Sequence, residues 1–156
     1  MLGLGLAVAA AVVAVDRLVK WWLIAALGPD ERVLEVTPFF ALVMVWNRGL
    51  SFGLLATDLS YLPWLFIAVA AGIVAGLVLW LRRVRLWWLA AGIGLVIGGA
   101  VGNVIDRLRY GAVADFFDLH VAGYHWPAFN VADAAISVGV VLLLADALFV
   151  RRERSR

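Results

Sequence analysis

Four long apolar stretches constrain this sequence more than any other feature. They cover residues 2–23, 62–81, 86–105 and 129–150. A helix needs about 20 apolar residues to cross a hydrocarbon core of about 30 Å, and each stretch meets that requirement. With 65% hydrophobic residues overall, the composition lies far outside the range of soluble globular chains. The sequence predicts a mainly α, polytopic membrane protein with four transmembrane helices, built as one domain over residues 1–156.

The first stretch is interpreted as a retained anchor rather than a removable signal peptide. It lacks a basic start and reaches Asp16, Arg17 and Lys20 before any small-residue cleavage site.

The arginine distribution sets the predicted topology, because short basic loops stay in the cytoplasm. One basic cluster lies within residues 82–85 and another within residues 151–156. An even number of spans puts both clusters and both termini on the cytoplasmic side. The segments 25–61 and 106–128 then face outward, and they contain Asp30, Glu31, Glu35, Asp58, Asp106, Asp115 and Asp118.

The first outward segment favours short β-strands. Between Glu31 and Gly53 it is rich in valine and aromatic residues, interrupted by Pro38 and Gly49. Backbone outside helices cannot lie unpaired in lipid, so these strands must pair or rest on the helix ends. We expect a small extracytoplasmic β-sheet platform.

Small and aromatic residues in the spans are interpreted as structural. Gly94, Gly98 and Gly102 have the four-residue spacing that lets helices pack closely in lipid. An interfacial aromatic belt is indicated by tryptophans near the predicted span ends, namely Trp21, Trp22, Trp80, Trp87, Trp88 and Trp126.

Ionisable groups in or beside a span cost about 2.5–3.5 kcal/mol on insertion scales, so each needs a reason. They concentrate in four segments, 16–20, 47–53, 98–118 and 127–136. A structural interpretation is open for each segment. The candidates are an Asp16–Lys20 ion pair on one helix face, a turn with an exposed Arg48, an Asp106–Arg107 pair, and a helix-dipole role for Asp133. Asp146 is interpreted as an interface residue that balances the arginine tail.

A chemical interpretation pairs Asp115 with Asp133, because the chain returns from the third helix to the fourth at one membrane face. Two carboxylates in a low-dielectric site cannot both ionise cheaply, so one keeps a proton. The ionised member can then activate water while the protonated member polarises an amide carbonyl. No thiolate is available, because the sequence has no cysteine. No metal site is predicted, because His120 and His125 lie in a loop without a further ligand pattern.

Taken together, the four segments resemble the bacterial lipoprotein signal peptidases, or signal peptidase II, a family of four-span aspartic peptidases. The sequence contains D-x-x-x-K in the first span, N-x-G-x-x-F-G after the strands, G-N-x-x-D-R followed by V-x-D-F, and F-N-x-A-D opening the last span. Each motif alone is weak. Four in this order, covering nearly the whole chain, are highly specific.

The resemblance implies that Asp115 and Asp133 form a catalytic dyad. It implies an aspartic endopeptidase that removes the signal peptide just before a diacylglyceryl-modified cysteine. A polar shell that positions substrate and braces the dyad is implied at Asp16, Lys20, Asn47, Gly49, Asn103, Asp106, Arg107 and Asn130. The family usually has a small residue where Leu50 stands and often a serine where Ala134 stands. Neither departure removes a catalytic group.

The resemblance also implies partners and a location. The partners are lipid-modified prolipoprotein substrates and membrane lipids, with no nucleic acid and no cofactor, and we expect a monomer. The implied location is the bacterial cytoplasmic (inner) membrane, with the active site near the outer face.

Two other function classes remain open. A transporter or proton channel predicts acids spread through the membrane depth, whereas here they cluster at one face and only Asp146 lies near the other. A structural or assembly protein predicts that Asp115→Asn and Asp133→Asn variants keep their function. Other intramembrane aspartic peptidases carry Y-D and G-x-G-D motifs, which this sequence lacks.

Overall fold

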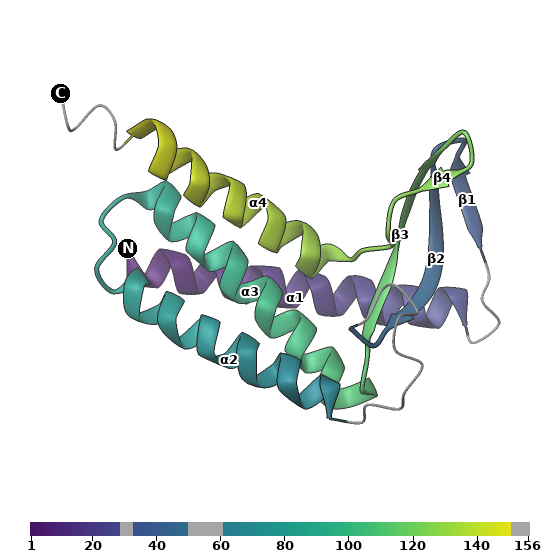
Figure 1. Cartoon of the computed structure of the whole chain (residues 1–156), viewed down its shortest axis with the longest axis horizontal. Coiled ribbons are helices and arrows are strands. Elements are labelled where there is room, and N and C mark those ends of the chain that lie inside the picture. Colours follow the sequence, from purple (N-terminus) through teal and green to yellow (C-terminus); the bar gives the residue numbers. More distant parts are fainter. Residues whose placement is uncertain (29–32, 50–60, 151–156) are drawn as a thin grey trace.

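Four helices form a bundle with a small sheet at one end (Figure 1). The structure, a computed structural model, describes residues 1–28, 33–49 and 61–150. Several residues considered above lie outside these ranges, namely Asp30, Glu31, residues 50–53, Asp58 and the basic tail 151–156.

The helices are α1 (Leu2–Leu27), α2 (Leu62–Leu81), α3 (Trp87–Tyr110) and α4 (Val131–Ala145), which continues as a π-helical turn over Asp146–Val150. Four helices in the described part of the chain are long and apolar enough to cross a membrane. This confirms the predicted fold class.

Two helices run beyond the spans expected from apolar residues alone. α1 continues to Leu27, and α3 continues through Asp106 and Arg107 to Tyr110. Helix α3 therefore ends five residues later than the expected span 86–105. α3 stops only where Gly111 adopts a left-handed conformation, with φ of 70°, which ends a helix readily.

α3 is the central helix of the bundle. In the most apolar stretch of α3, 56% of the residues are buried, compared with 6% in that of α2. Glycines allow this close packing: a methyl group at Gly98 would lie 2.7 Å from the Ala9 carbonyl oxygen of α1. Gly99 similarly faces the Ala132 carbonyl of α4, and Gly94 faces Gly5 of α1. The packing interpretation of the glycine pattern is confirmed.

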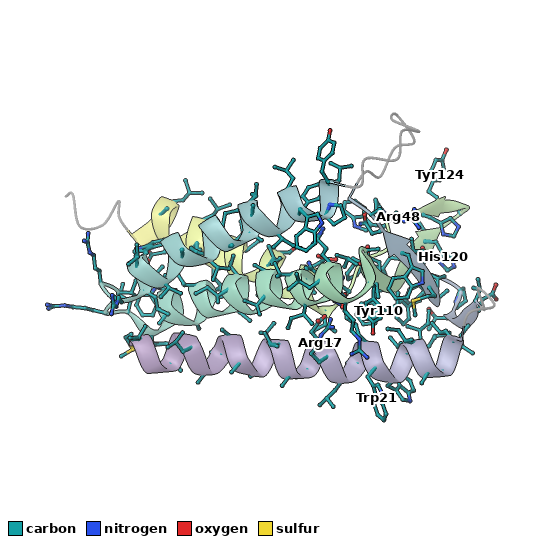
Figure 2. All side chains as sticks on the ribbon, turned by 90° about the horizontal axis from the view of Figure 1, so that it is seen from below. Arg17, Trp21, Arg48, Tyr110, His120 and Tyr124 are labelled. Carbon is teal, nitrogen blue, oxygen red and sulfur yellow. The ribbon has the colours of Figure 1, made fainter. Side chains whose placement is uncertain are left out.

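Most of the tryptophans assigned to the belt have exposed side chains: Trp21, Trp22, Trp80, Trp87 and Trp126. Trp21 points away from the bundle (Figure 2). Trp88 differs, because its indole N–H donates to Asp146 Oδ1 at 3.0 Å. Asp146 therefore links α3 to the end of α4.

The sheet has four antiparallel strands in the order β1-β2-β3-β4, with bounds Leu34–Thr37, Phe40–Asn47, Val113–Val121 and Tyr124–His125. The first two strands confirm the small sheet predicted for residues 25–61. The other two lie within residues 106–128, for which no strand is predicted, so His120 and His125 lie on strands rather than in a loop. β3 contains charged residues but pairs along β2, and this pairing overrides its weak sequence signal.

The sheet is attached to the bundle on both sides of β3. Phe116 is fully buried against Leu23 and Leu27 near the end of α1. Phe117 pairs through its backbone with Phe129, just before α4. β3 is therefore held between the end of α1 and the start of α4.

Candidate active site

Asp115 lies on β3 and is only 2% exposed. Its Oδ2 accepts a hydrogen bond from the Asn47 side-chain amide of β2 at 3.0 Å. Its Oδ1 accepts one from the Asn130 side-chain amide at 2.6 Å. Both oxygens are therefore fixed by amide donors that come from outside β3.

Asp133 lies in the first turn of α4, where Asn130 is the N-cap. The Asn130 side chain accepts from the Asp133 backbone N–H at 2.9 Å, and Asp133 Oδ2 accepts from the Asn130 backbone N–H at 3.3 Å. This is a capping box, so the structural role considered for Asp133 at the helix start is real. Asp133 Oδ1 also accepts from the Asn103 side-chain amide at 2.7 Å, which gives Asp133 a partner beyond its own helix.

Asn130 joins the two carboxyl groups. It is fully buried, and its side-chain amide also approaches Asn103 Oδ1 and the Ala114 carbonyl oxygen, each at 3.3 Å. One residue thus caps the helix that carries Asp133 and hydrogen-bonds Asp115. We call Asp115 and Asp133 the carboxylate pair.

Burial raises the pKa of Asp115 to about 6, from an ordinary value of 3.8. The nearby negative charge of Asp133 raises this pKa further, whereas the hydrogen bonds from Asn47 and Asn130 and the charge of Lys20 lower it. The surroundings of Asp115 thus favour a retained proton on this carboxyl group.

A cluster of four charges lies beside the carboxylate pair, between α1 and α3. Lys20 Nζ lies 2.6 Å from Asp106 and 3.1 Å from Asp16, and Arg17 Nη2 lies 2.6 Å from Asp106 and 2.9 Å from Asp16. The two cations balance the two anions. The Asp16–Lys20 pair is therefore present, but as half of a larger cluster.

This charge cluster holds the backbone beside each member of the carboxylate pair. Asp106 Oδ2 accepts from the backbone N–H of Ala114, and Asp16 Oδ1 accepts from that of Ala132, each at 3.2 Å. These two residues come directly before the paired aspartates. Lys20 Nζ adds a hydrogen bond to Asn103 Oδ1 at 3.5 Å. The cluster therefore positions β3 and α4 relative to α1 and α3.

Asn47 and Gly49 form a tight turn after β2. Asn47 Oδ1 accepts from the Gly49 N–H at 2.8 Å, and Gly49 has φ of 101°. A methyl group at Gly49 would overlap the Phe66 ring of α2, so glycine is required for conformation and for space. Arg48 in this turn is exposed, as the structural interpretation expects.

Arg107 contacts the same Phe66 ring. Its guanidinium carbon is 5.1 Å from the ring centre, and Nη1 donates to the Asn103 carbonyl at 3.3 Å. Asp106 pairs with α1, and within the described residues no ion pair joins it to Arg107. The suggested Asp106–Arg107 pair is therefore wrong, because neighbouring side chains on a helix point in different directions.

The structure brings the sequence-predicted residues into one connected region. The amides of Asn47, Asn103 and Asn130 contact the carboxylate pair, Asp16, Lys20 and Asp106 belong to the charge cluster, and Gly49 and Arg107 lie against Phe66.

Sequence reasoning misses two contributors to this region. The predicted polar shell does not include Arg17, and Phe66 is not among the candidate residues. The signal for Arg17 is a third ionisable residue between Asp16 and Lys20 in an apolar stretch. Phe66 carries no such signal, because one aromatic residue in a lipid-facing helix is ordinary.

These features define a polytopic membrane protein with a polar, carboxylate-bearing site at one end of its bundle. The family model described as signal peptidase (SPase) II matches residues 8–149. A lipoprotein signal peptidase of Methylorubrum extorquens (strain PA1) is 45% identical over 147 residues, which cover 92% of this chain and 85% of the relative. That of Oleidesulfovibrio alaskensis is 46% identical over 134 residues, 85% of this chain and 86% of the relative.

A solved structure described as a bacterial membrane enzyme superposes with a TM-score of 0.80 at 30% identity, covering 94% of each chain. The chain belongs to the signal peptidase (SPase) II family. It is therefore a peptidase of the membrane.

Proposed function

We propose that this protein is an aspartic endopeptidase that removes the signal peptide from diacylglyceryl-modified prolipoproteins. It cuts just before the lipid-modified cysteine, with Asp115 and Asp133 as the catalytic dyad. The observation that carries the proposal is the junction at Asn130, which hydrogen-bonds both carboxyl groups and so joins them in one network. Family membership and the names of the relatives supply the substrate class.

The dyad divides the chemistry between its members. Protonated Asp115 donates a hydrogen bond to the scissile carbonyl oxygen, while ionised Asp133 takes a proton from water. The water oxygen attacks the carbonyl carbon while Asp115 transfers its proton to the carbonyl oxygen, which gives a tetrahedral diol. The C–N bond then breaks as Asp133 gives the proton it took from water to the leaving amine. Asp115 takes a proton back from one diol hydroxyl group, so both aspartates return to their starting states. The start of α4 favours negative charge on Asp133, because backbone N–H groups point outward there.

The surrounding amides keep this arrangement in place before substrate arrives. Asn47, Asn103 and Asn130 contact carboxyl oxygens that would otherwise turn freely. Preorganised donors of this kind lower the cost of rearrangement during the reaction.

The proposed location is the bacterial inner membrane, with both termini in the cytoplasm and the sheet outside. This orientation follows from the basic segments, which favour the cytoplasmic side. In it, the substrate's lipid chains stay in the bilayer while the scissile bond meets the dyad near the outer surface. Among the described residues, the acidic side chains cluster toward the sheet end of the bundle, and Asp146 is the exception. This distribution favours an active site at one membrane face over an ion path that crosses the membrane.

Cleavage of a purified diacylglyceryl-modified prolipoprotein in detergent, followed by gel shift, tests the proposal. Asp133→Asn and Asp115→Asn should each lower the cleavage rate by at least about a hundredfold, because each removes a proton-transfer group. Arg85→Gln, in an exposed loop, is the matched control and should cleave at the native rate. Equal cleavage by the native chain and either folded Asn variant would refute the dyad.

A further inference from the structure

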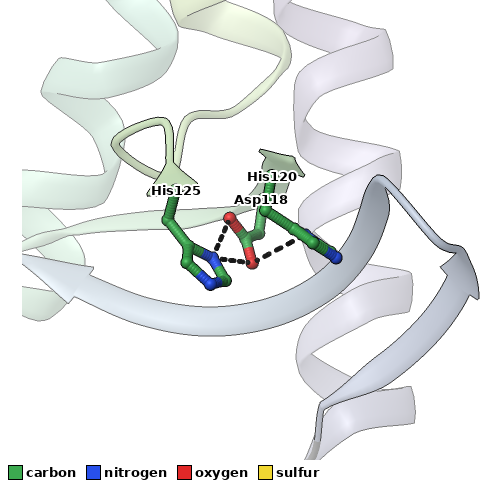
Figure 3. A group of neighbouring side chains, drawn as sticks. All are labelled: Asp118, His120 and His125. Carbon is green, nitrogen blue, oxygen red and sulfur yellow. Dashed lines mark hydrogen bonds and ion pairs between the residues drawn. The ribbon is translucent and has the colours of Figure 1, made fainter. Parts of the chain in front are cut away.

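A second polar cluster lies on the sheet, formed by Asp118, His120 and His125 (Figure 3). His125 Nδ1 lies 2.9 Å and 3.0 Å from the two carboxylate oxygens of Asp118. His120 Nδ1 lies 3.4 Å from Asp118 Oδ2. In the described part of the chain, none of the hydrogen bonds of the carboxylate pair reaches this cluster.

The fold itself brings these three side chains together. Asp118 and His120 are two residues apart on β3, so they point to the same face of the sheet. His120 pairs directly with His125 across the β3–β4 hairpin. The two residues that close this hairpin, Ala122 and Gly123, have φ of 50° and 83°. Positive φ at both positions is typical of a tight type I′ turn, which fixes the register.

One ring nitrogen in this cluster lacks a hydrogen bond within the described residues. His120 Nδ1 is buried and has no hydrogen-bond partner within the described residues, because its contact with Asp118 is poorly aligned. A buried polar atom without a partner is costly. The imidazole rings of His120 and His125 are nearly parallel, with centres 4.9 Å apart. The Nδ1 atoms of both rings face the Asp118 carboxylate (Figure 3).

We propose that Asp118, His120 and His125 bind one divalent first-row transition-metal ion, with Zn²⁺ the chemistry they suit best. Two imidazole nitrogens and one carboxylate oxygen are a common zinc ligand set that leaves a fourth position open. Ligand atoms about 2 Å from a tetrahedral ion lie a little over 3 Å from one another. The donor atoms here lie within 4.8 Å of one another, so small side-chain rotations suffice.

The surroundings leave room for a fourth ligand. A hollow of about 460 Å³ adjoins His120 and His125 and is lined mainly by apolar side chains, among them Phe39, Tyr124 and Trp126. A water molecule can complete the coordination from this side. The ion would tie β4 to β3, the strand that also carries Asp115, and so stiffen the sheet next to the dyad.

Zinc binding by the full chain, measured by calorimetry in detergent, tests the proposal. The protein is stripped with a chelator and freed of any polyhistidine tag. The native chain should bind one Zn²⁺, and His125→Gln and Asp118→Asn should each weaken binding by at least about tenfold. His125 is largely exposed, so its replacement leaves folding intact.

Two matched controls separate this site from other sources of binding. Tyr124→Phe, on the same hairpin, should bind like the native chain. Asp133→Asn should also bind normally, because the carboxylate pair takes no part. Co²⁺ added in place of Zn²⁺ should give visible absorption bands that His125→Gln abolishes. The proposal is overturned if the native chain takes up no zinc, if His125→Gln binds as tightly, or if only Asp133→Asn loses binding.

Discussion

Asn47 acts on Asp115 through a single hydrogen bond. Its amide donates to Asp115 Oδ2 at 3.0 Å, and this bond lowers the pKa of Asp115 against the larger effect of burial. Because the proposed mechanism needs Asp115 protonated, kcat/KM should fall as pH rises through about 6. The raised pKa of Asp115 also makes folding stability depend on pH. Asp115 contributes fully to stability below pH 3.8, its ordinary pKa, and this contribution is lost as the pH rises through about 6.

Replacing Asn47 should therefore move the pH profile in a known direction. In Asn47→Ala the pKa of Asp115 rises further, so the descending limb of kcat/KM should shift to higher pH. A pH series of prolipoprotein cleavage measures this shift. Arg48→Ala, at the exposed neighbouring position, should keep the native limb. A limb that stays in place or moves to lower pH in Asn47→Ala would contradict the assignment of Asp115 as the acid.

At the scale of elements, the contact between α3 and α4 leaves no space for a methyl group. A Cβ at Gly99 would overlap the Ala132 carbonyl, one residue before Asp133. Overpacking of this kind costs about 1–3 kcal/mol, so Gly99→Ala should lower the thermal unfolding midpoint in detergent. A methyl group added at Gly76 of α2 would meet nothing within 4 Å. Gly76→Ala should therefore leave the midpoint unchanged or raise it, and equal effects of the two substitutions would refute the tight α3–α4 contact.

At the scale of the whole molecule, the charge cluster connects four elements. Lys20 is almost fully buried between Asp16 and Asp106, which hold the starts of α4 and β3. Lys20→Met leaves these carboxylates with Arg17 alone, and breaking a buried pair costs about 3–5 kcal/mol. Thermal unfolding in detergent should show a large loss for Lys20→Met and little change for the exposed Arg85→Met. Adding Asp106→Asn to Lys20→Met should recover part of the loss, whereas additive losses would mean that the charges do not act as one cluster.

The orientation of the chain is also a property of the whole molecule. With no native cysteine, each single-cysteine variant carries one thiol. In whole cells, the proposed orientation predicts that a membrane-impermeant maleimide labels Tyr124→Cys, on the β3–β4 hairpin, and spares Arg83→Cys, in the basic loop between α2 and α3. After lysis both should react. Labelling of Arg83→Cys alone in intact cells would reverse the proposed topology.

Local patterns in the sequence were enough to predict the four spans and the first two strands. They also supplied the motifs that contain the predicted site residues. Hydrophobic length depends only on neighbouring residues, so the prediction for Leu62–Leu81 has the bounds that the structure shows. Contacts between distant segments were decided only by the tertiary structure. β3 forms because β2 offers a partner, Asp106 pairs with Arg17 and Lys20 because α1 packs on α3, and Asp118 meets His125 because a tight turn sets the hairpin register. Such pairings depend on burial and on partners far away in the chain, and no local pattern of residues encodes them.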